Sequence, residues 1–217
     1  MLDALTFTKT PKVASMLFSD ALWKVDTAKK KLYLTFDDGP IPEVTPWVLA
    51  ELKKYNALAT FFCIGKNIAA NPEIFQQILE EGHSIGNHTY DHLNGWQTEN
   101  NTYFENIEKC SKELEVGSSE FTTTRNPQLF RPPYGKLTPS QYSTLKSQYK
   151  IVMWDVLSFD FDVSIEKEDV LKNVIDNAET GSIILFHDSL KALEKVKYAL
   201  PQVLEYFSKK GFTFDKL

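Results

Sequence analysis

The chain has 217 residues, of which 42% are hydrophobic and 24% are charged, values that are ordinary for a soluble globular protein. The formal net charge of −5 gives no reason to expect nucleic acid or an anionic membrane as the main partner. No run of about 18 uninterrupted apolar residues occurs, so the sequence predicts no membrane span.

Residues 1–7 lack the basic segment and the apolar core of an export signal, and we therefore expect a cytoplasmic protein. A trimmed export signal would leave the same sequence. After this start, short β-rich runs alternate with longer amphipathic segments over the whole length. No composition break, repeat or low-complexity tract marks a second domain, so residues 1–217 are predicted to form one domain.

About seven strand–helix units follow one another, and this alternation is typical of a parallel sheet with helices outside it. The predicted strands are 31–36, 59–64, 84–86, 129–131, 151–156, 182–186 and 211–214, the last of which could close the sheet. The predicted helices are 43–55, 72–81, 98–115, 138–147, 165–178 and 190–209.

The alternation alone fits a barrel or an open doubly wound sheet. Polar clusters follow several of the predicted strands, and active sites assembled from the carboxyl ends of many strands are typical of (β/α) barrels. We therefore predict an α/β barrel, similar to a TIM barrel. The polar residues in question are Asp37, Asp38, His88, His92, Arg131, Asp160 and His187.

A metal site is indicated by three of these residues. His88 and His92 are four residues apart, and on a helix their rings would share one face and converge on one ion. Asp38, at the end of a predicted strand, supplies a harder third ligand. Two histidines and one carboxylate leave a coordination position open for water, as a hydrolytic metal requires. Zinc is the ion we expect, although cobalt, nickel and iron also suit these ligands.

The neighbouring Asp37 is expected to play a separate role, because consecutive strand residues point in different directions. It can stay free to take a proton from water while Asp38 binds the ion. Cys63 lies in the apolar run 59–64 and is predicted to be a buried core thiol, since one pair with Cys110 is no disulfide framework. His83 is predicted to make structural hydrogen bonds.

Five motifs in order closely resemble the polysaccharide deacetylases of carbohydrate esterase family four, the NodB-homology domain. They are TFDDGP at 35–40, HTYDH at 88–92, RPPYG at 131–135, the segment 154–160 and LFHD at 185–188. Together they span roughly residues 31–190. The resemblance implies a distorted (β/α)7 barrel, which agrees with the alternation of elements.

The resemblance also implies a role for each matching residue. Asp37 resembles the general base, held by Arg131, and His187 resembles the general acid, tuned by Asp160. The metal ligands implied are Asp38, His88 and His92. The substrate contacts implied are Tyr134, whose backbone N–H helps to bind the oxyanion, Leu185 of the acetyl pocket, and Pro132 of the same motif as Tyr134.

Two positions depart from the family pattern. Leu157 stands where the family commonly has Asp, and Phe161 stands where it commonly has Trp. An aromatic wall is kept, so these changes are expected to affect substrate preference more than the chemistry. The remaining tryptophans Trp23, Trp47 and Trp96 are expected to pack rather than to bind sugar.

We therefore predict a metal-dependent hydrolase that removes N-acetyl groups from N-acetylglucosamine units of a chitin-like or peptidoglycan-like glycan and releases acetate. One alternative is O-deacetylation of acetylated xylan, because the same site attacks esters more easily than amides. Another alternative, of a different class, is an inactive barrel that only binds glycan. The presence of both Asp37 and His187 argues against it, since a binding protein has no use for a base and an acid.

Overall fold

The protein is described by a computed structural model that covers residues 7–117 and 128–217. The strands are β1 (Lys31–Asp38), β2 (Ala59–Cys63), β3 (Ser84–Asn87), β4 (Gln128–Phe130), β5 (Tyr149–Ile151), β6 (Val156–Leu157), β7 (Ile183–His187) and β8 (Thr213–Phe214). Seven of them form one curved, parallel sheet in the order β5-β4-β3-β2-β1-β7-β6. The predicted α/β barrel is therefore confirmed in its distorted form.

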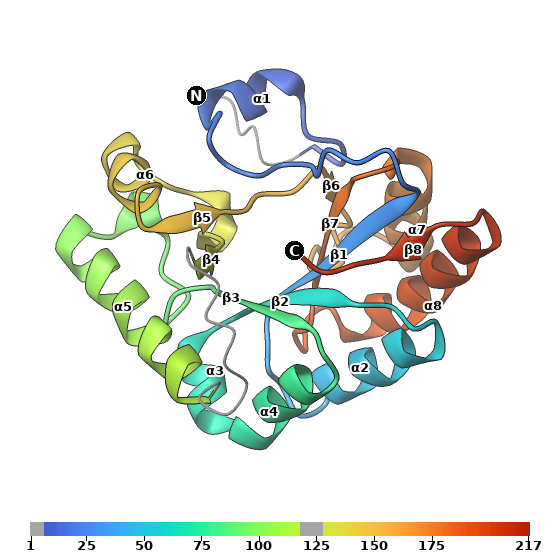
Figure 1. Cartoon of the computed structure of the whole chain (residues 1–217), viewed down its shortest axis with the longest axis horizontal. Helices are drawn as coiled ribbons and strands as arrows, with labels where there is room; N and C mark the ends of the chain where they lie inside the picture. Colours follow the sequence, from blue (N-terminus) through green and yellow to red (C-terminus); the bar gives the residue numbers. More distant parts are fainter. Residues whose placement is uncertain (1–6, 118–127) are drawn as a thin grey trace.

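Helices surround this arc of strands, as Figure 1 shows. They are α1 (Lys12–Leu17), α2 (Thr45–Lys54), α3 (Gly65–Ala70), α4 (Pro72–Glu80), α5 (Asn100–Gly117), α6 (Pro139–Leu145), α7 (Lys167–Asn177) and α8 (Leu193–Lys209). The predicted helices match α2 and α4 to α8, whereas α1 and α3 were not predicted. Local sequence explains two of the helix termini. Thr138 and Gln141 form a capping box at the start of α6, and Gly82, which has a φ of 82°, follows the end of α4.

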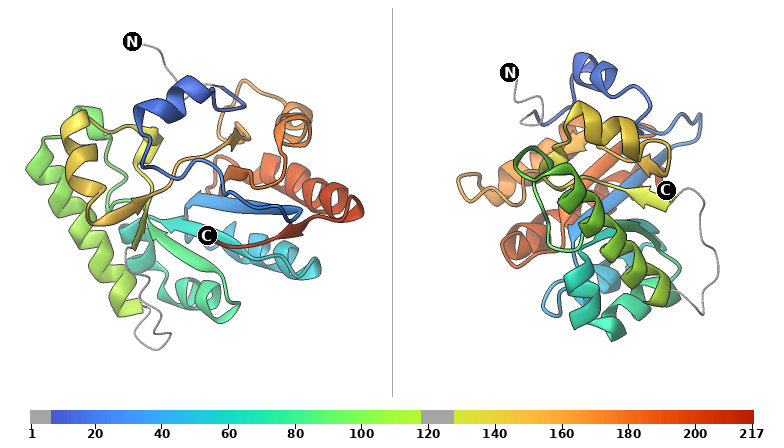
Figure 2. Two further views of the ribbon diagram at one scale, coloured as in Figure 1. Left: turned by 45° about the horizontal axis from the view of Figure 1, so that its top comes forward. Right: turned by 90° about the vertical axis from the view of Figure 1, so that its left-hand side faces the viewer.

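The predicted strand 151–156 is wrong, because the chain there forms two strands at opposite edges of the sheet. It ends β5 at Ile151, crosses between the edges, and begins β6 at Val156. N-terminal segments fill the opening between these edges: the Met153 amide donates to the Leu22 carbonyl and the Leu157 amide to the Thr8 carbonyl, both at 2.8 Å. Helix α1 lies on the side of the arc of strands opposite α3 and α4 (Figures 1 and 2).

The last predicted strand also differs from the structure. Strand β8 does not close the sheet, since it pairs with Lys31 and Leu32 at the start of β1. Both cysteines are free and buried, as predicted for Cys63. Among the described helices, none combines the length and the apolar character needed to cross a membrane.

The two faces of β1 explain where the polar side chains of the site lie. Leu34 and Phe36 are fully buried in the layer between the sheet and the helices. Tyr33 belongs to the second apolar cluster, inside the curved sheet. Because strand residues alternate, Thr35 and Asp37 share the inner face with Tyr33. This alternation delivers Asp37 to the carboxyl end of the barrel interior.

Candidate active site

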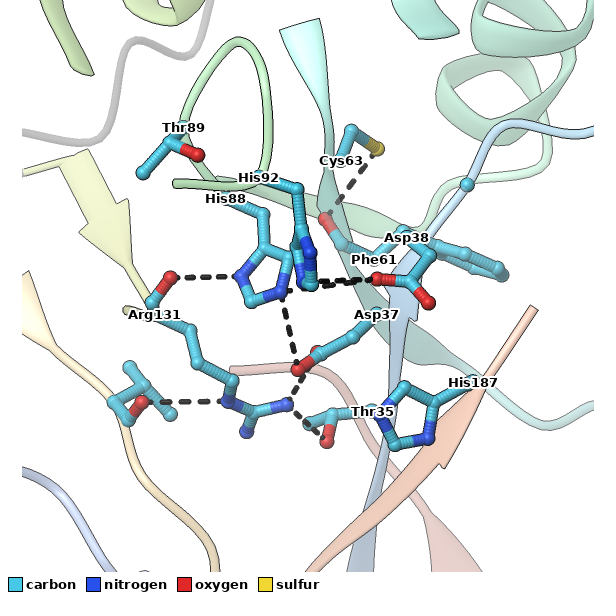
Figure 3. Close-up of polar contacts among 12 residues, drawn as sticks. Thr35, Asp37, Asp38, Phe61, Cys63, His88, Thr89, His92, Arg131 and His187 are labelled. Carbon is cyan, nitrogen blue, oxygen red and sulfur yellow. Dashed lines mark hydrogen bonds and ion pairs between the residues drawn. The ribbon is translucent and has the colours of Figure 1, made fainter. Parts of the chain in front are cut away.

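The predicted site residues gather at the carboxyl ends of the strands, and Figure 3 shows six of them: Asp37, Asp38, His88, His92, Arg131 and His187. A cavity of about 600 Å³ lies there. Its lining includes Asp37, Asp38, His88, His92, Tyr134, Leu185 and His187. Arg131 and Asp160 are fully buried beneath these side chains. The structure therefore brings the predicted site residues together at the carboxyl end of the parallel strands.

Asp38 reaches the cavity through an unusual backbone conformation. Strand alternation from Asp37 would turn its side chain toward the outer helices, but Asp38 has a φ of 90° at the end of β1. Its Oδ1 atom lies 3.4 Å from His92 Nε2 and 3.9 Å from His88 Nε2. This buried oxygen has no hydrogen-bond partner among the described residues.

The three ligand atoms of Asp38, His88 and His92 lie within 4.8 Å of one another. Metal–ligand bonds of about 2.0–2.2 Å around zinc place ligand atoms at such separations. The unpartnered Asp38 oxygen and the donor set of two imidazoles and one carboxylate therefore fit a divalent metal ion.

The predicted helix through His88 and His92 is wrong. His88 directly follows β3, and the segment up to residue 94 is a loop. Thr89 and His92 both have a positive φ, of 62° and 58°, which an α-helix excludes. The imidazoles converge all the same, with ring centroids 5.1 Å apart. The loop therefore brings the two rings together without helical spacing.

Two asparagines hold this loop in place. Asn87 Oδ1 accepts a hydrogen bond from the Thr89 amide at 2.8 Å. Asn106, on α5, accepts from the Tyr90 amide at 2.8 Å and from the Asp91 amide at 3.0 Å. Its own amide group donates to Asp91 Oδ2 at 2.8 Å. Side-chain amides thus take the place of the backbone bonds that a helix would supply.

The environment keeps the ligand histidines neutral. His88 Nδ1 lies 2.7 Å from the Arg131 carbonyl oxygen, which can only accept, so this nitrogen carries the proton and Nε2 is left to bind a metal. Burial, and then the nearby His92, lower the pKa of His88 well below its usual value. Burial likewise lowers the pKa of His92.

Arg131 connects the floor of the cavity to Asp37. Its Nη1 donates to Asp37 Oδ1 at 2.7 Å and to Thr35 Oγ1 at 2.8 Å, and its Nη2 donates to the Met153 carbonyl at 2.8 Å. The guanidinium lies 4.2 Å from the centre of the Phe62 ring. Burial lowers the pKa of Arg131, an effect that the charge of Asp37 opposes, but guanidinium stays protonated in proteins.

The second carboxylate oxygen of Asp37 faces the metal ligands. Asp37 Oδ2 lies 3.7 Å from His88 Nε2, while Oδ1 is held by Arg131. Asp37 also pairs with His187 in the β1–β7 register, so the two side chains project from the same face of the sheet.

His187 is held by Asp160 at two points. Its Nδ1–H donates to Asp160 Oδ1 at 2.8 Å, and its backbone amide donates to Asp160 Oδ2 at 2.7 Å. Burial by itself lowers the pKa of His187, but the charge and hydrogen bond of Asp160, with Asp38 and Asp37, raise it to about 9. Asp160 therefore favours the protonated form of His187 at neutral pH.

The residues predicted to contact substrate lie in different places. Leu185 and Tyr134 line the cavity, and the Tyr134 ring lies 4.7 Å from the His92 ring. Tyr134 has a φ of 59°, and its amide has no backbone acceptor among the described residues. Pro132 is buried and does not line the cavity. Its carbonyl accepts from the Gly135 amide at 2.9 Å, which closes the turn that carries Tyr134.

Asp188 is a site residue that sequence reasoning missed. This buried carboxylate accepts from the Gly39 amide at 2.9 Å and from Thr45 Oγ1 at 2.6 Å, and so fixes the turn after Asp38. A Cβ atom at Gly39 would lie 1.9 Å from Asp188 Oδ2, so only glycine fits. Burial raises the pKa of Asp188 to about 8. The sequence signal that could have identified Asp188 is its position next to His187 in the fifth motif, LFHD at 185–188.

Other cavity residues had weak signals or none. Leu157 and Phe161, the two departures from the family pattern, both line the cavity, and the Phe161 ring stands edge-on to His187 with centroids 5.0 Å apart. The aromatic wall is thus present. Lys136 and Lys191 also line the cavity and were not predicted, because an isolated lysine has no distinctive sequence pattern. Gly135, Trp154 and Ser189 complete the lining.

Comparison with known proteins agrees with this geometry. Residues 24–151 match the family model described as Polysaccharide deacetylase. The chain is 35% identical to a peptidoglycan-N-acetylglucosamine deacetylase of Bacillus cereus, over 88% of each protein, and 36% identical to a chitooligosaccharide deacetylase of Azorhizobium caulinodans, over 76% of this chain and 77% of that protein.

The crystal structure of the Bc1960 peptidoglycan N-acetylglucosamine deacetylase superimposes with a TM-score of 0.84, at 32% identity and covering 94% of both chains. The matched family model spans more than half of the chain, and the fold extends the likeness to nearly all of it. The chain therefore belongs to the polysaccharide deacetylase family, carbohydrate esterase family four.

Proposed function

We propose that the protein removes N-acetyl groups from N-acetylglucosamine units of a polysaccharide or oligosaccharide and releases acetate. One observation carries the proposal: Asp37 and His187, neighbours across β1 and β7, share a cavity with the triad of Asp38, His88 and His92. The relatives above, named for deacetylation of peptidoglycan and chitooligosaccharide, support an N-acetylated glycan as the substrate.

The triad is proposed to hold one divalent ion, with zinc as the expected metal. Two imidazoles and one carboxylate suit zinc, and also cobalt, nickel or iron. When bound, such an ion polarises the acetyl carbonyl and makes water nucleophilic at neutral pH. Asp38 Oδ1 and the two Nε2 atoms are the protein atoms that would hold it.

Asp37 is the proposed general base. Because Arg131 occupies its Oδ1, the Oδ2 atom is the one that accepts the proton of the attacking water. Because Arg131 is itself held by Thr35 and by the Met153 carbonyl, it fixes the orientation of the Asp37 carboxylate. The backbone amide of Tyr134 is proposed to donate to the oxyanion that develops on the acetyl carbonyl oxygen, and Leu185 to contact the acetyl methyl group.

His187 is the proposed general acid. Its Nδ1–H is bound to Asp160, so Nε2–H is the proton that passes to the departing amine nitrogen. An amide anion is a very poor leaving group, and a pKa of about 9 keeps this imidazole protonated at neutral pH. The raised pKa favours amide hydrolysis over O-deacetylation, because an alkoxide needs less help from an acid. An inactive binding barrel has no use for either group.

Acetate release from chitohexaose, peptidoglycan and acetylated xylan tests the proposal, together with metal analysis of the purified protein. We expect release from at least one of the N-acetylated glycans, loss after chelation, and recovery with zinc. Release from xylan alone would favour the O-deacetylase. Binding of glycans without any acetate release, in metal-loaded protein, would favour the binding barrel.

A further inference from the structure

Two lysines flank the reacting centre on opposite sides of the cavity. Lys136 follows β4, beside Tyr134, and Lys191 follows β7, beside His187. Strands β3, β2 and β1 lie between β4 and β7 in the sheet, and two of these deliver the metal ligands. The two ammonium groups therefore stand on either side of the position where the acetyl group reacts.

The lining is cationic, although the protein as a whole carries a net charge of −5. Of the described residues that line the cavity, Asp37 and Asp38 are the only carboxylates. Asp37 is paired with Arg131, and Asp38 faces the two ligand histidines. Neither carboxylate forms an ion pair with Lys136 or Lys191, and within residues 7–117 and 128–217 the two lysines outnumber the one carboxylate, Asp38, that no cation of the protein pairs with.

The lysines have no ion-pair partner in the described part of the chain. Asp162 is an acidic neighbour of Lys191: hydrogen bonds from Ser164, and then the charges of Lys195 and Lys191, lower the pKa of Asp162. Its carboxylate is engaged by the Ser164 hydroxyl at 2.7 Å, and Asp162 does not line the cavity. The charge of each lysine thus remains available to a ligand.

Each lysine lies beside an aromatic ring. Lys136 Nζ is 5.0 Å from the centre of the Trp96 ring, which is 46% exposed, and Lys191 Nζ is 5.8 Å from the centre of the Phe161 ring. A ring can pack on the apolar face of a sugar while an ammonium pairs with an acidic substituent of that sugar. The same pairing therefore occurs on both sides of the reacting centre.

We infer that the substrate is an acidic glycan, in which the sugars on both sides of the reacting N-acetylated unit carry a carboxylate. This inference rests on the proposed deacetylase function and adds the charge of the substrate to it. Lys136 and Lys191 bind the two carboxylates and so select an alternating acidic polymer over a neutral one such as chitin.

The test uses a peptidoglycan glycan-strand hexasaccharide freed of its peptides, with a lactyl carboxylate on every second sugar, and the methyl ester of the same hexasaccharide. We expect a higher kcat/KM for the acid than for the ester, and a preference that shrinks as salt is added. Lys136→Met and Lys191→Met should each reduce the acid-to-ester ratio by about two- to fivefold. Lys172→Met, an exposed lysine on α7 away from the cavity, should keep the ratio.

Equal rates on the acid and the ester, or equal losses on both in the lysine variants, would overturn the inference. The failure of the proposed function is a different result, namely no acetate from either hexasaccharide or from chitohexaose. In that case, calorimetric binding of the acid and the ester to the same variants still decides the role of the lysines.

Discussion

The two sides of the cavity hold histidines in opposite protonation states. On the side of β3, burial lowers the pKa of His88 and of His92, and nothing nearby offsets it fully. On the side of β7, His187 is also buried, but Asp160 accepts its Nδ1–H and raises its pKa to about 9. The contrast comes from the partner of Nδ1, which is a neutral carbonyl for His88 and a carboxylate for His187.

This difference matches the two jobs that the site requires. A metal ligand must offer a lone pair, so a neutral imidazole is needed, whereas a general acid must carry a proton. Five substitutions can break or sharpen the contrast, and the largest effect is expected on the metal side.

His88→Ala should abolish both metal binding and activity. The variant removes one of three ligand atoms and leaves an unfilled space beside Asp38. Metal content after gel filtration, measured by atomic emission, and acetate release check this expectation. Full metal occupancy in His88→Ala would show that the ion is held elsewhere.

Asp37→Asn should keep the metal but lose most turnover. Asparagine can still accept the Arg131 hydrogen bond, whereas it cannot accept a proton from water. Removal of a general base typically lowers the rate about 10²–10⁴-fold. Metal content should equal that of the wild type, and a thermal melt checks that the uncompensated charge of Arg131 has not unfolded the protein. Near-normal rates on an acetylated glycan would remove Asp37 from the role of base.

His187→Ala should damage amide hydrolysis more than hydrolysis of an activated acetate ester. The departing amine needs a proton, while a phenolate leaves without one. We expect a loss of about 10²–10⁴-fold on the glycan amide and a smaller loss on 4-nitrophenyl acetate. Equal losses on both substrates would indicate a positioning role in place of acid catalysis.

Much of the site was predictable from the sequence, because Asp37, Asp38, Arg131 and His187 each end or follow an apolar run. Their convergence follows from parallel strands whose carboxyl ends meet. The split of 151–156 was not predictable, since every residue of that segment is buried and all but Asp155 are apolar, a pattern that indicates one buried strand. Only the N-terminal segments that pair with it, far away in the sequence, explain the crossing.

The loop between the ligand histidines was not predictable for a similar reason. His88 and His92 are spaced as on a helix, but Asn106, on α5, supplies the hydrogen bonds to the Tyr90 and Asp91 amides that stabilise a loop instead. Lysines such as Lys136 and Lys191 carry no periodic signal, so only the folded cavity shows that they belong to the site. The cytoplasmic location stays a prediction.

Asn106→Ala should weaken metal binding without removing a ligand. The substitution frees the Tyr90 and Asp91 amides, and the loop then samples conformations in which the two imidazoles diverge. Loss of a residue that orients metal ligands typically costs about 10–100-fold in metal affinity. Competition with a chelator of known affinity measures the change, and Asn101→Ala, at an exposed position in the first turn of α5, serves as the control. Unchanged affinity would mean that the loop keeps its shape without this contact.

Asp160→Asn should move the alkaline limb of the rate profile to lower pH, the smallest of the five effects. The folded protein raises the pKa of His187 to about 9, so the acid form is present below that pH and is lost as the pH rises through it. Asparagine can accept the Nδ1–H but brings no negative charge, so the pKa of His187 falls and the acid form is lost earlier. The rate on an N-acetylated glycan, followed from pH 6 to 10 in wild type and variant, gives the two limbs. An alkaline limb that stays at the same pH in Asp160→Asn would show that deprotonation of His187 does not limit the rate at high pH. The contrast between the two sides of the cavity would then not depend on the charge of Asp160.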